Sequence, residues 1–215
     1  MKPTIDVYWS FRSPYSYLVT PELLKLRDDY EVEVKLRPVL PIAVRSKQTL
    51  FTADDPSKVR YIIMDSARRA EYLGMSMAFP SPDPVVQDLE TFEVAAEQPY
   101  IFRLCALGIE AERRGKGIDL AFEVSRLIWG GTSGWDQGDH LARAVASAGL
   151  DLEELEAAVA QYDALAEVEA NQQSLEEAGH WGVPTMVFQG EPFFGQDRIN
   201  TLRWRLDQHG LAKTN

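Results

Sequence analysis

Segments with strand character lie only at the two ends of this 215-residue chain, and this arrangement limits the folds open to it. Near the N-terminus, residues 5–9 form a short apolar run, and residues 32–36 alternate apolar and charged side chains as a half-solvated strand does. Apolar residues at helical spacing lie between them, with Pro21 inside the pattern predicting a kink. This end therefore predicts a strand–helix–strand unit with parallel strands.

The C-terminal end predicts a second small unit. Residues 185–188 have strand character, residues 189–192 have turn chemistry, and residues 193–194 begin a second short strand, which together predict a hairpin. Apolar residues at helical spacing then predict a last amphipathic helix. Between the two ends, the spacing predicts helices over residues 59–74, 88–114, 120–129, 137–148 and 151–178.

Joined together, the two outer units give the order βαβ–ββα. This is the order of a minimal thioredoxin core, so we predict an α/β, thioredoxin-like fold with a large all-helical insertion. The predicted thioredoxin-like domain comprises residues 1–55 and 179–215, and the predicted inserted helical domain comprises residues 56–178.

Charge and cysteine content narrow the classes of function. The chain carries 33 acidic and 22 basic side chains, a net charge of −11, which disfavours nucleic acid and anionic membranes as partners. Cys105, the single cysteine, lies in an apolar helical stretch and is expected to be a buried structural thiol. The absence of disulfides and of a signal-like apolar run predicts a cytoplasmic protein, and the three histidines have no metal-ligand spacing.

Ser13 is the first candidate for chemistry. Serine before Pro14 is a favoured helix N-cap, and this is the simplest reading of the pair. The same position also places a hydroxyl among the unpaired N–H groups of a helix N-terminus, where a thiolate or another anion is stabilised.

Two further candidates lie near the C-terminus. Pro184 opens a strand after Val183, so the bond between them is either trans, as most X–Pro bonds are, or cis, which would turn the Val183 backbone outward to pair with an extended peptide. Gly195 permits close backbone approach. Gln196 and Asp197 follow at the start of the last helix, where Asp197 is either a favourable first-turn charge or a receptor for a ligand ammonium.

The predicted helical insertion carries weaker candidates. Trp129, followed by two glycines, either ends a helix or forms the wall of an apolar pocket. Tyr61, Asp65, Arg68 and Arg69 lie at helical spacing, which solvated pairing along one helix explains adequately.

Residues 11–18, 182–185 and 190–198 together resemble the 2-hydroxychromene-2-carboxylate isomerases, which belong with the kappa-class glutathione transferases and DsbA-like proteins. The resemblance covers nearly the whole chain in order, with further family-like pieces at residues 58–61 and at Trp129-Gly130. It implies glutathione as cofactor, with Ser13 on the glutathione sulfur, Val183 next to Pro184 on the cysteinyl backbone, and residues 194–197 (Phe194, Gly195, Gln196 and Asp197) on the γ-glutamyl end.

The resemblance also implies a small aromatic carboxylate as substrate and a homodimer as the assembly. Arg45 is the nearest basic candidate for the substrate carboxylate, with Lys47 as its rival, and Tyr61 and Trp129 are further substrate candidates. Family members often carry an asparagine in the segment after the second strand, and residues 44–52 contain none. This departure concerns the substrate more than the cofactor.

The sequence therefore predicts a glutathione-dependent isomerase of the 2-hydroxychromene-2-carboxylate type. A kappa-like glutathione S-transferase and a non-catalytic thioredoxin-like binding module are the alternatives. A dithiol oxidoreductase is disfavoured, because both positions of a Cys-x-x-Cys motif are serine, Ser13 and Ser16.

Overall fold

The computed structural model describes residues 2–45, 55–88 and 90–214. Four strands form one sheet, in the order β2-β1-β3-β4. They are β1 (Thr4–Trp9), β2 (Glu33–Pro38), β3 (Thr185–Phe188) and β4 (Glu191–Phe194). β1 and β2 are parallel, whereas β3 is antiparallel to both β1 and β4. The predicted strand–helix–strand unit and the C-terminal hairpin are thus confirmed.

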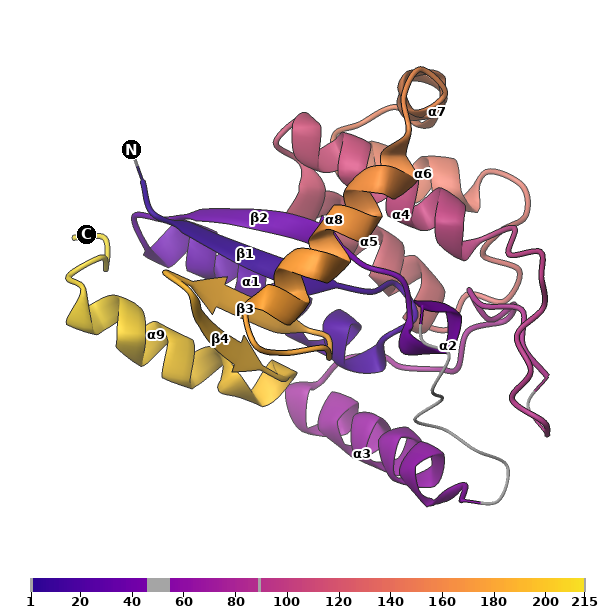
Figure 1. Ribbon diagram of the computed structural model, residues 1–215, viewed down its shortest axis with the longest axis horizontal. Coiled ribbons are helices and arrows are strands. Elements are labelled where there is room, and N and C mark those ends of the chain that lie inside the picture. Colours follow the sequence, from indigo (N-terminus) through magenta and orange to yellow (C-terminus); the bar gives the residue numbers. More distant parts are fainter. Residues whose placement is uncertain (1, 46–54, 89, 215) are drawn as a thin grey trace.

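Helices surround this sheet (Figure 1). Their bounds are α1 (Pro14–Asp29), α2 (Ile42–Arg45), α3 (Ser57–Leu73), α4 (Ile101–Arg113), α5 (Gly117–Trp129), α6 (His140–Ser147), α7 (Leu152–Val159), α8 (Ala164–Glu177) and α9 (Ile199–Gln208), with the short 3₁₀ helix η1 (Gln196–Arg198) before α9. Helices α3 to α8 all lie between β2 and β3 in the sequence, as the thioredoxin-like fold with a helical insertion requires. The domain boundaries at residues 55 and 178 stay a prediction.

Helices cover both faces of the sheet. Alternate residues of a strand point to opposite faces, so β1 contributes buried side chains to both. Ile5, Val7 and Trp9 of β1 belong to the main core, together with residues of α1 and α9. Tyr8 points to the other face, where it packs with Leu175 of α8. Figure 1 shows α8 crossing the sheet on that side. The main core also contains residues of α4, α5 and α6, so the helical segment and the sheet share it.

Three of the predicted inserted helices lie within three residues of their observed bounds, whereas the other two differ more. The helix predicted over residues 88–114 begins only at Ile101. The Asp88 carboxylate accepts the N–H groups of Glu90 and Thr91 at 2.7 and 2.8 Å, and Pro99 lacks the N–H that a helix interior requires. These local features outweigh the apolar spacing.

The helix predicted over residues 151–178 is two helices, α7 and α8. Asp163 caps α8, because its carboxylate accepts the N–H groups of Leu165 and Ala166, both at 3.1 Å. Aspartate favours this N-cap geometry over a helix interior, so the chain turns at this point although the apolar period continues.

No helix among the described residues is both long and apolar enough to span a bilayer.

Candidate functional site

The strand directions bring four segments to one edge of the sheet. The carboxyl ends of β1, β2 and β4 lie there together with the start of β3, since Trp9 pairs with Pro38, and Thr185 pairs with both Tyr8 and Phe194. The segments that follow or precede these ends carry Ser13, Arg45, Val183 and Gln196. Residues far apart in the sequence therefore meet at this edge.

Ser13 is the N-cap of α1, and Pro14 is the first residue of the helix. The Ser13 Oγ accepts the N–H of Ser16 at 3.2 Å. This contact uses a lone pair of the hydroxyl and leaves its proton, for which the described residues provide no acceptor. The hydroxyl can therefore cap the helix and donate a hydrogen bond to an anion at the same time.

The loop before β3 presents an unpaired stretch of backbone. The peptide bond between Val183 and Pro184 is cis. The Gly195 N–H donates to the Pro184 carbonyl at 2.9 Å, and the Thr185 hydroxyl donates to the Gly182 carbonyl at 2.7 Å, so the loop is held on both sides. Within the described part of the chain, the N–H and C=O of half-buried Val183 have no hydrogen-bond partner. They are available to an extended peptide.

After β4, the chain turns sharply at Gly195, whose φ is +103°. The Asp197 carboxylate folds back over this turn, because a Cβ added at Gly195 would lie 2.7 Å from Asp197 Oδ1. Asp197 is exposed and pairs with Arg198 at 3.2 Å. Only glycine fits under the carboxylate in this left-handed conformation.

Helix α3 contacts this edge through two long-range hydrogen bonds. The Tyr15 hydroxyl donates to Asp65 at 2.7 Å, and Arg69 Nε donates to Gln196 Oε1 at 2.8 Å. The hydrogen bond from Tyr15 lowers the pKa of the Asp65 carboxyl, whereas burial raises the pKa of Tyr15. The ion pairing along one helix that the sequence predicts is present between Arg68 Nη2 and Asp65 Oδ1, which are 2.7 Å apart. The contacts across to α1 and η1 were not foreseen.

Tyr61 lies on the same helix and is half exposed. Its hydroxyl accepts Arg68 Nη2 at 3.2 Å, and the Arg68 guanidinium lies 5.5 Å from the Tyr61 ring centroid. Tyr61 is therefore joined to the Asp65 group near the start of α1, and its role in substrate binding stays a prediction.

Arg45 ends α2, after β2, and reaches the segment before β3. Its Nη2 donates to the Trp181 carbonyl, and its buried Nε has no hydrogen-bond partner among the described residues. Burial lowers the pKa of the Arg45 guanidinium. The charge of Glu176 acts on Arg45 in the opposite direction, but no carboxylate that the structure describes forms an ion pair with it. A partly desolvated guanidinium in this situation is suited to bind an anionic ligand. Its predicted rival, Lys47, lies outside the described residues.

An aromatic cluster of His180, Trp181 and Phe194 lies beside the loop before β3. The His180 ring stacks on Phe194 with centroids 4.0 Å apart and on Trp181 at 5.6 Å. Trp181 and Phe194 are 47% and 43% exposed, which is unusual for side chains so large. His180 and Trp181 were not predicted as site residues, although two aromatic residues directly before Gly182-Val183-Pro184 are a signal that the sequence contains.

Trp129 is buried beneath the turn that leads into α1. Its indole N–H donates to the Phe11 carbonyl at 3.0 Å, and the Phe79 ring packs against it edge-on at 5.9 Å. This position favours a supporting role for Trp129 over direct contact with a ligand.

We therefore expect Trp129→Phe to lower the free energy of unfolding by about 1–3 kcal/mol, because the buried Phe11 carbonyl loses its donor. Urea denaturation measures this change. Trp204→Phe is the matched control, because Trp204 is 51% exposed, and we expect it to stay within about 0.5 kcal/mol of the unmodified protein. Equal stability of the two variants would contradict the supporting role.

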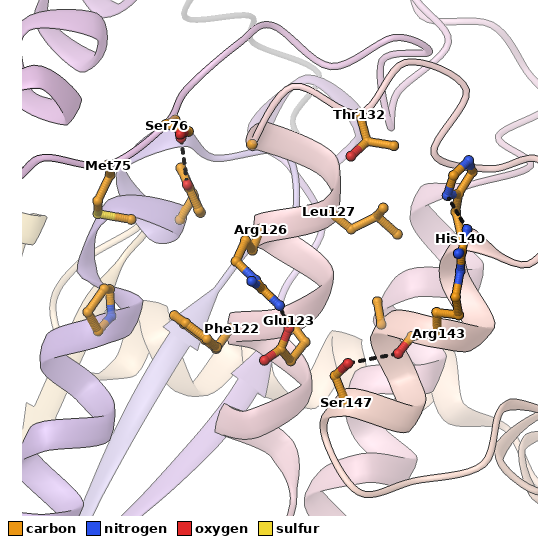
Figure 2. Close-up of a pocket in the computed structure, with 14 residues that line it drawn as sticks. Met75, Ser76, Phe122, Glu123, Arg126, Leu127, Thr132, His140, Arg143 and Ser147 are labelled. Atoms are coloured by element: carbon orange, nitrogen blue, oxygen red, sulfur yellow. Dashed lines mark hydrogen bonds and ion pairs between the residues drawn. The ribbon is translucent and has the colours of Figure 1, made fainter.

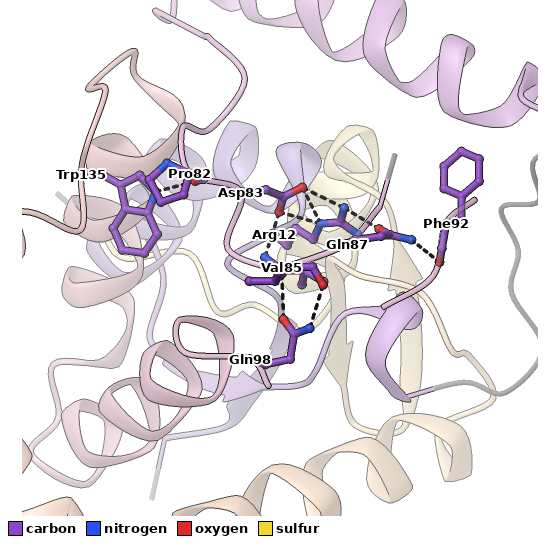
Figure 3. Close-up of polar contacts among 9 residues, drawn as sticks. Arg12, Pro82, Asp83, Val85, Gln87, Phe92, Gln98 and Trp135 are labelled. Atoms are coloured by element: carbon purple, nitrogen blue, oxygen red, sulfur yellow. Dashed lines mark hydrogen bonds and ion pairs between the residues drawn. The ribbon is translucent and has the colours of Figure 1, made fainter. Parts of the chain in front are cut away.

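The same turn is held from another direction by Arg12 (Figure 3). Arg12 donates to both oxygens of Asp83, at 2.9 and 2.8 Å, and to Gln87 at 2.8 Å. Gln87 in turn donates to the Phe92 carbonyl. Asp83, Gln87 and Phe92 are thus connected to the residue directly before Ser13.

A cavity of about 610 Å³ lies along the other flank of α1, between α1, α5 and α6 (Figure 2). Tyr17, Phe122, Arg126 and Arg143 are among its lining residues, whereas Ser13, Val183 and Gln196 are not. The cavity is therefore separate from the edge at which the predicted site residues meet.

Redox and metal chemistry find little support in the described side chains. Cys105 is fully buried, and burial raises the pKa of its thiol to about 12, so it stays protonated at neutral pH. The described residues contain no group of three or more histidine, cysteine, aspartate or glutamate side chains arranged to hold a metal ion.

Solved structures with this fold include three informative neighbours. A 2-hydroxychromene-2-carboxylate isomerase shares 23% identity over 96% of this chain and 95% of its own, with a TM-score of 0.68. A probable DsbA oxidoreductase from Streptomyces coelicolor shares 19% identity over 99% and 92%, with a TM-score of 0.66. The cytosolic disulfide reductase DsbM from Pseudomonas aeruginosa, solved also with GSH, shares 16% identity over 95% and 99%, with TM-scores of 0.59 and 0.60.

At these identities the neighbours establish the fold alone. A search of curated protein sequences gave no significant match. The family model described as DSBA-like thioredoxin domain matches residues 4–207, almost the entire chain. With its βαβ–ββα core and the helices inserted between the two halves, this protein belongs to the DSBA-like thioredoxin domain family.

Proposed function

We propose that this protein is a glutathione-dependent isomerase of an aromatic carboxylate, of the 2-hydroxychromene-2-carboxylate type. The proposal rests mainly on the position and hydrogen bonding of Ser13. This serine places a free hydroxyl proton at the N-terminus of α1 in a chain whose single thiol is buried. A thiol reaction at this position therefore requires a thiol from a ligand.

The residues at the sheet edge fit glutathione. The unpaired backbone of Val183, next to Pro184, matches the cysteinyl unit of an extended peptide. The exposed Asp197 carboxylate beside Gly195 suits an ammonium group, and the Gln196 amide and neighbouring Phe194 complete the proposed γ-glutamyl end. When bound, glutathione supplies a thiolate that adds to a conjugated double bond and leaves again after rotation, so that it is not consumed.

The protein's part is electrostatic and positional. The Ser13 hydroxyl donates to the sulfur, and the α1 N-terminus favours its negative charge. A hydrogen bond to a charged group contributes about 1.5–3 kcal/mol, enough to lower a thiol pKa by one to two units. Arg45 receives the substrate carboxylate, and the exposed ring of Trp181 offers a surface on which a planar aromatic can stack.

Several neighbours and features support the proposal. The 2-hydroxychromene-2-carboxylate isomerase shares the fold across nearly the full length, and DsbM has been solved with GSH. DsbM is cytosolic, and a cytoplasmic location for this protein is part of the proposal, as are a homodimer and the absence of nucleic acid and membrane partners. The charge of −11 agrees with that absence.

Incubation with glutathione and a hydroxychromene carboxylate tests the proposal. The expected result is isomer formed at catalytic protein concentration with the glutathione content unchanged. Accumulation of a conjugate would instead indicate a kappa-like transferase. Absence of any reaction together with absence of glutathione binding would leave the non-catalytic binding module as the better account.

A further inference from the structure

Unpaired arginines are rare in this acidic chain. Within the described part of the chain, every arginine lies within 4.0 Å of a carboxylate except Arg45, Arg60 and Arg69. Arg60 is exposed to solvent, whereas Arg69 is half-buried. A guanidinium that is partly desolvated without an opposite charge is poised to receive an anion from a ligand.

Arg69 is held in place by two contacts. Its Nε donates to Gln196 Oε1 at 2.8 Å, and its guanidinium lies 4.9 Å from the centroid of the Tyr72 ring. Neither Nη group has an acceptor among the described residues. The planar guanidinium is therefore oriented by the protein, while most of its N–H donors stay available.

The same hydrogen bond orients Gln196. Because the amide oxygen faces the Arg69 donor, the amide nitrogen must point the other way, with both its hydrogens free to donate. The exposed carboxylate of Asp197 follows in the next position, and its Oδ2 pairs with Arg198 at 3.2 Å while Oδ1 lies over Gly195. The end of β4 thus offers N–H donors for a carboxylate and, beside them, an acceptor for an ammonium group.

This combination matches a free α-amino acid head group. A γ-glutamyl unit carries an unblocked α-carboxylate and α-ammonium, because its peptide bond is formed through the side chain. We propose that Arg69 of α3 is a binding residue that selects γ-glutamyl thiols, with its guanidinium and the Gln196 amide on the α-carboxylate and Asp197 on the ammonium. This inference rests on the proposed function. It assigns a ligand contact to α3, which is part of the helical insertion.

Calorimetric titration with three thiols tests it. Glutathione and γ-glutamylcysteine carry the γ-glutamyl head group, and cysteinylglycine lacks it. We expect Arg69→Gln to weaken binding of the first two by about 10- to 100-fold, the range of a lost charge-assisted hydrogen bond, and to leave cysteinylglycine unchanged. Arg69→Lys should give an intermediate loss, because a lysine keeps the charge without the planar fork.

Arg60→Gln is the matched control, since Arg60 lies on the same helix and is also unpaired, but is exposed. It should bind all three thiols as the unmodified protein does. Two results would overturn the inference and leave the proposed function intact. One is that Arg69→Gln binds glutathione as tightly as the unmodified protein does. The other is that Arg69→Gln weakens the binding of all three thiols equally. Failure of the unmodified protein to bind any of them would overturn both.

Discussion

Ser13→Ala is expected to lower kcat/KM of the glutathione-dependent isomerisation by about 10- to 100-fold, the effect of losing one hydrogen bond to a charged sulfur. The Ser13 proton has no acceptor among the described residues, so its loss removes an interaction with the bound thiol and breaks no hydrogen bond that the proton makes within the protein. The rate is measured at saturating and at limiting glutathione, so that binding and turnover are separated.

The alanine variant also removes a helix cap, because Ser13 Oγ accepts the Ser16 N–H. That loss costs about 1 kcal/mol of stability, whereas glycine at an N-cap costs only a few tenths. Ser13→Gly therefore separates the two roles, since it restores most of the stability and still lacks the hydroxyl. We expect Ser13→Gly to be as slow as Ser13→Ala. A glycine variant with the unmodified rate would show that Ser13 acts only as a cap.

The second large effect is a gain of activity. The double substitution Ser13→Cys with Ser16→Cys should produce thiol–disulfide exchange in an insulin reduction assay, where the unmodified protein stays at background. A thiol at a helix N-terminus has a lowered pKa. A change in thiol pKa from about 8.5 to about 7 raises the thiolate fraction at neutral pH from about 3% to about half, a gain of more than tenfold.

The site accepts this change for a specific reason. Ser16 is fully buried, and no side chain or backbone group of the described residues forms a hydrogen bond with its hydroxyl. A thiol tolerates such surroundings better than a hydroxyl does, so Ser16→Cys should not destabilise the fold. Ser16→Cys alone is the control and should be inactive, because burial keeps a thiol protonated. A double variant that folds and stays inactive would contradict the hypothesis that this edge of the sheet is a site for thiol chemistry.

Much of the sheet and the first helix could be predicted from local sequence patterns. The alternation over residues 32–36, the Ser13-Pro14 cap and the turn chemistry after residue 188 each act within a few residues, and the corresponding strands, helix and hairpin form. The turn itself is shorter than the predicted 189–192, because Glu191 and Pro192 already belong to β4. The errors arose where a side chain competes with the helix backbone. Asp88 and Asp163 both accept backbone N–H groups, and apolar spacing gives no sign of this.

The site was predictable only in part, because its contacts join distant segments. Ser13, Val183 and Gln196 were recognisable from short motifs, and the strand order explains why they share one edge. The hydrogen bond from Arg69 to Gln196 spans 127 positions and that from Arg12 to Asp83 spans 71. No periodicity within α3 indicates which neighbour its arginines contact. Spacing along one helix suggested only solvated pairs.

The ionisation of glutathione bound to the protein tests the central proposal most directly. An ultraviolet difference titration of the complex, followed at the thiolate absorbance, gives the apparent pKa of the bound thiol. With Ser13 donating to the sulfur at the α1 N-terminus, we expect this pKa to lie at least about one unit below that of free glutathione, and Ser13→Ala to return it most of the way. An unshifted thiol pKa in the complex, or no binding at millimolar glutathione, would contradict the account.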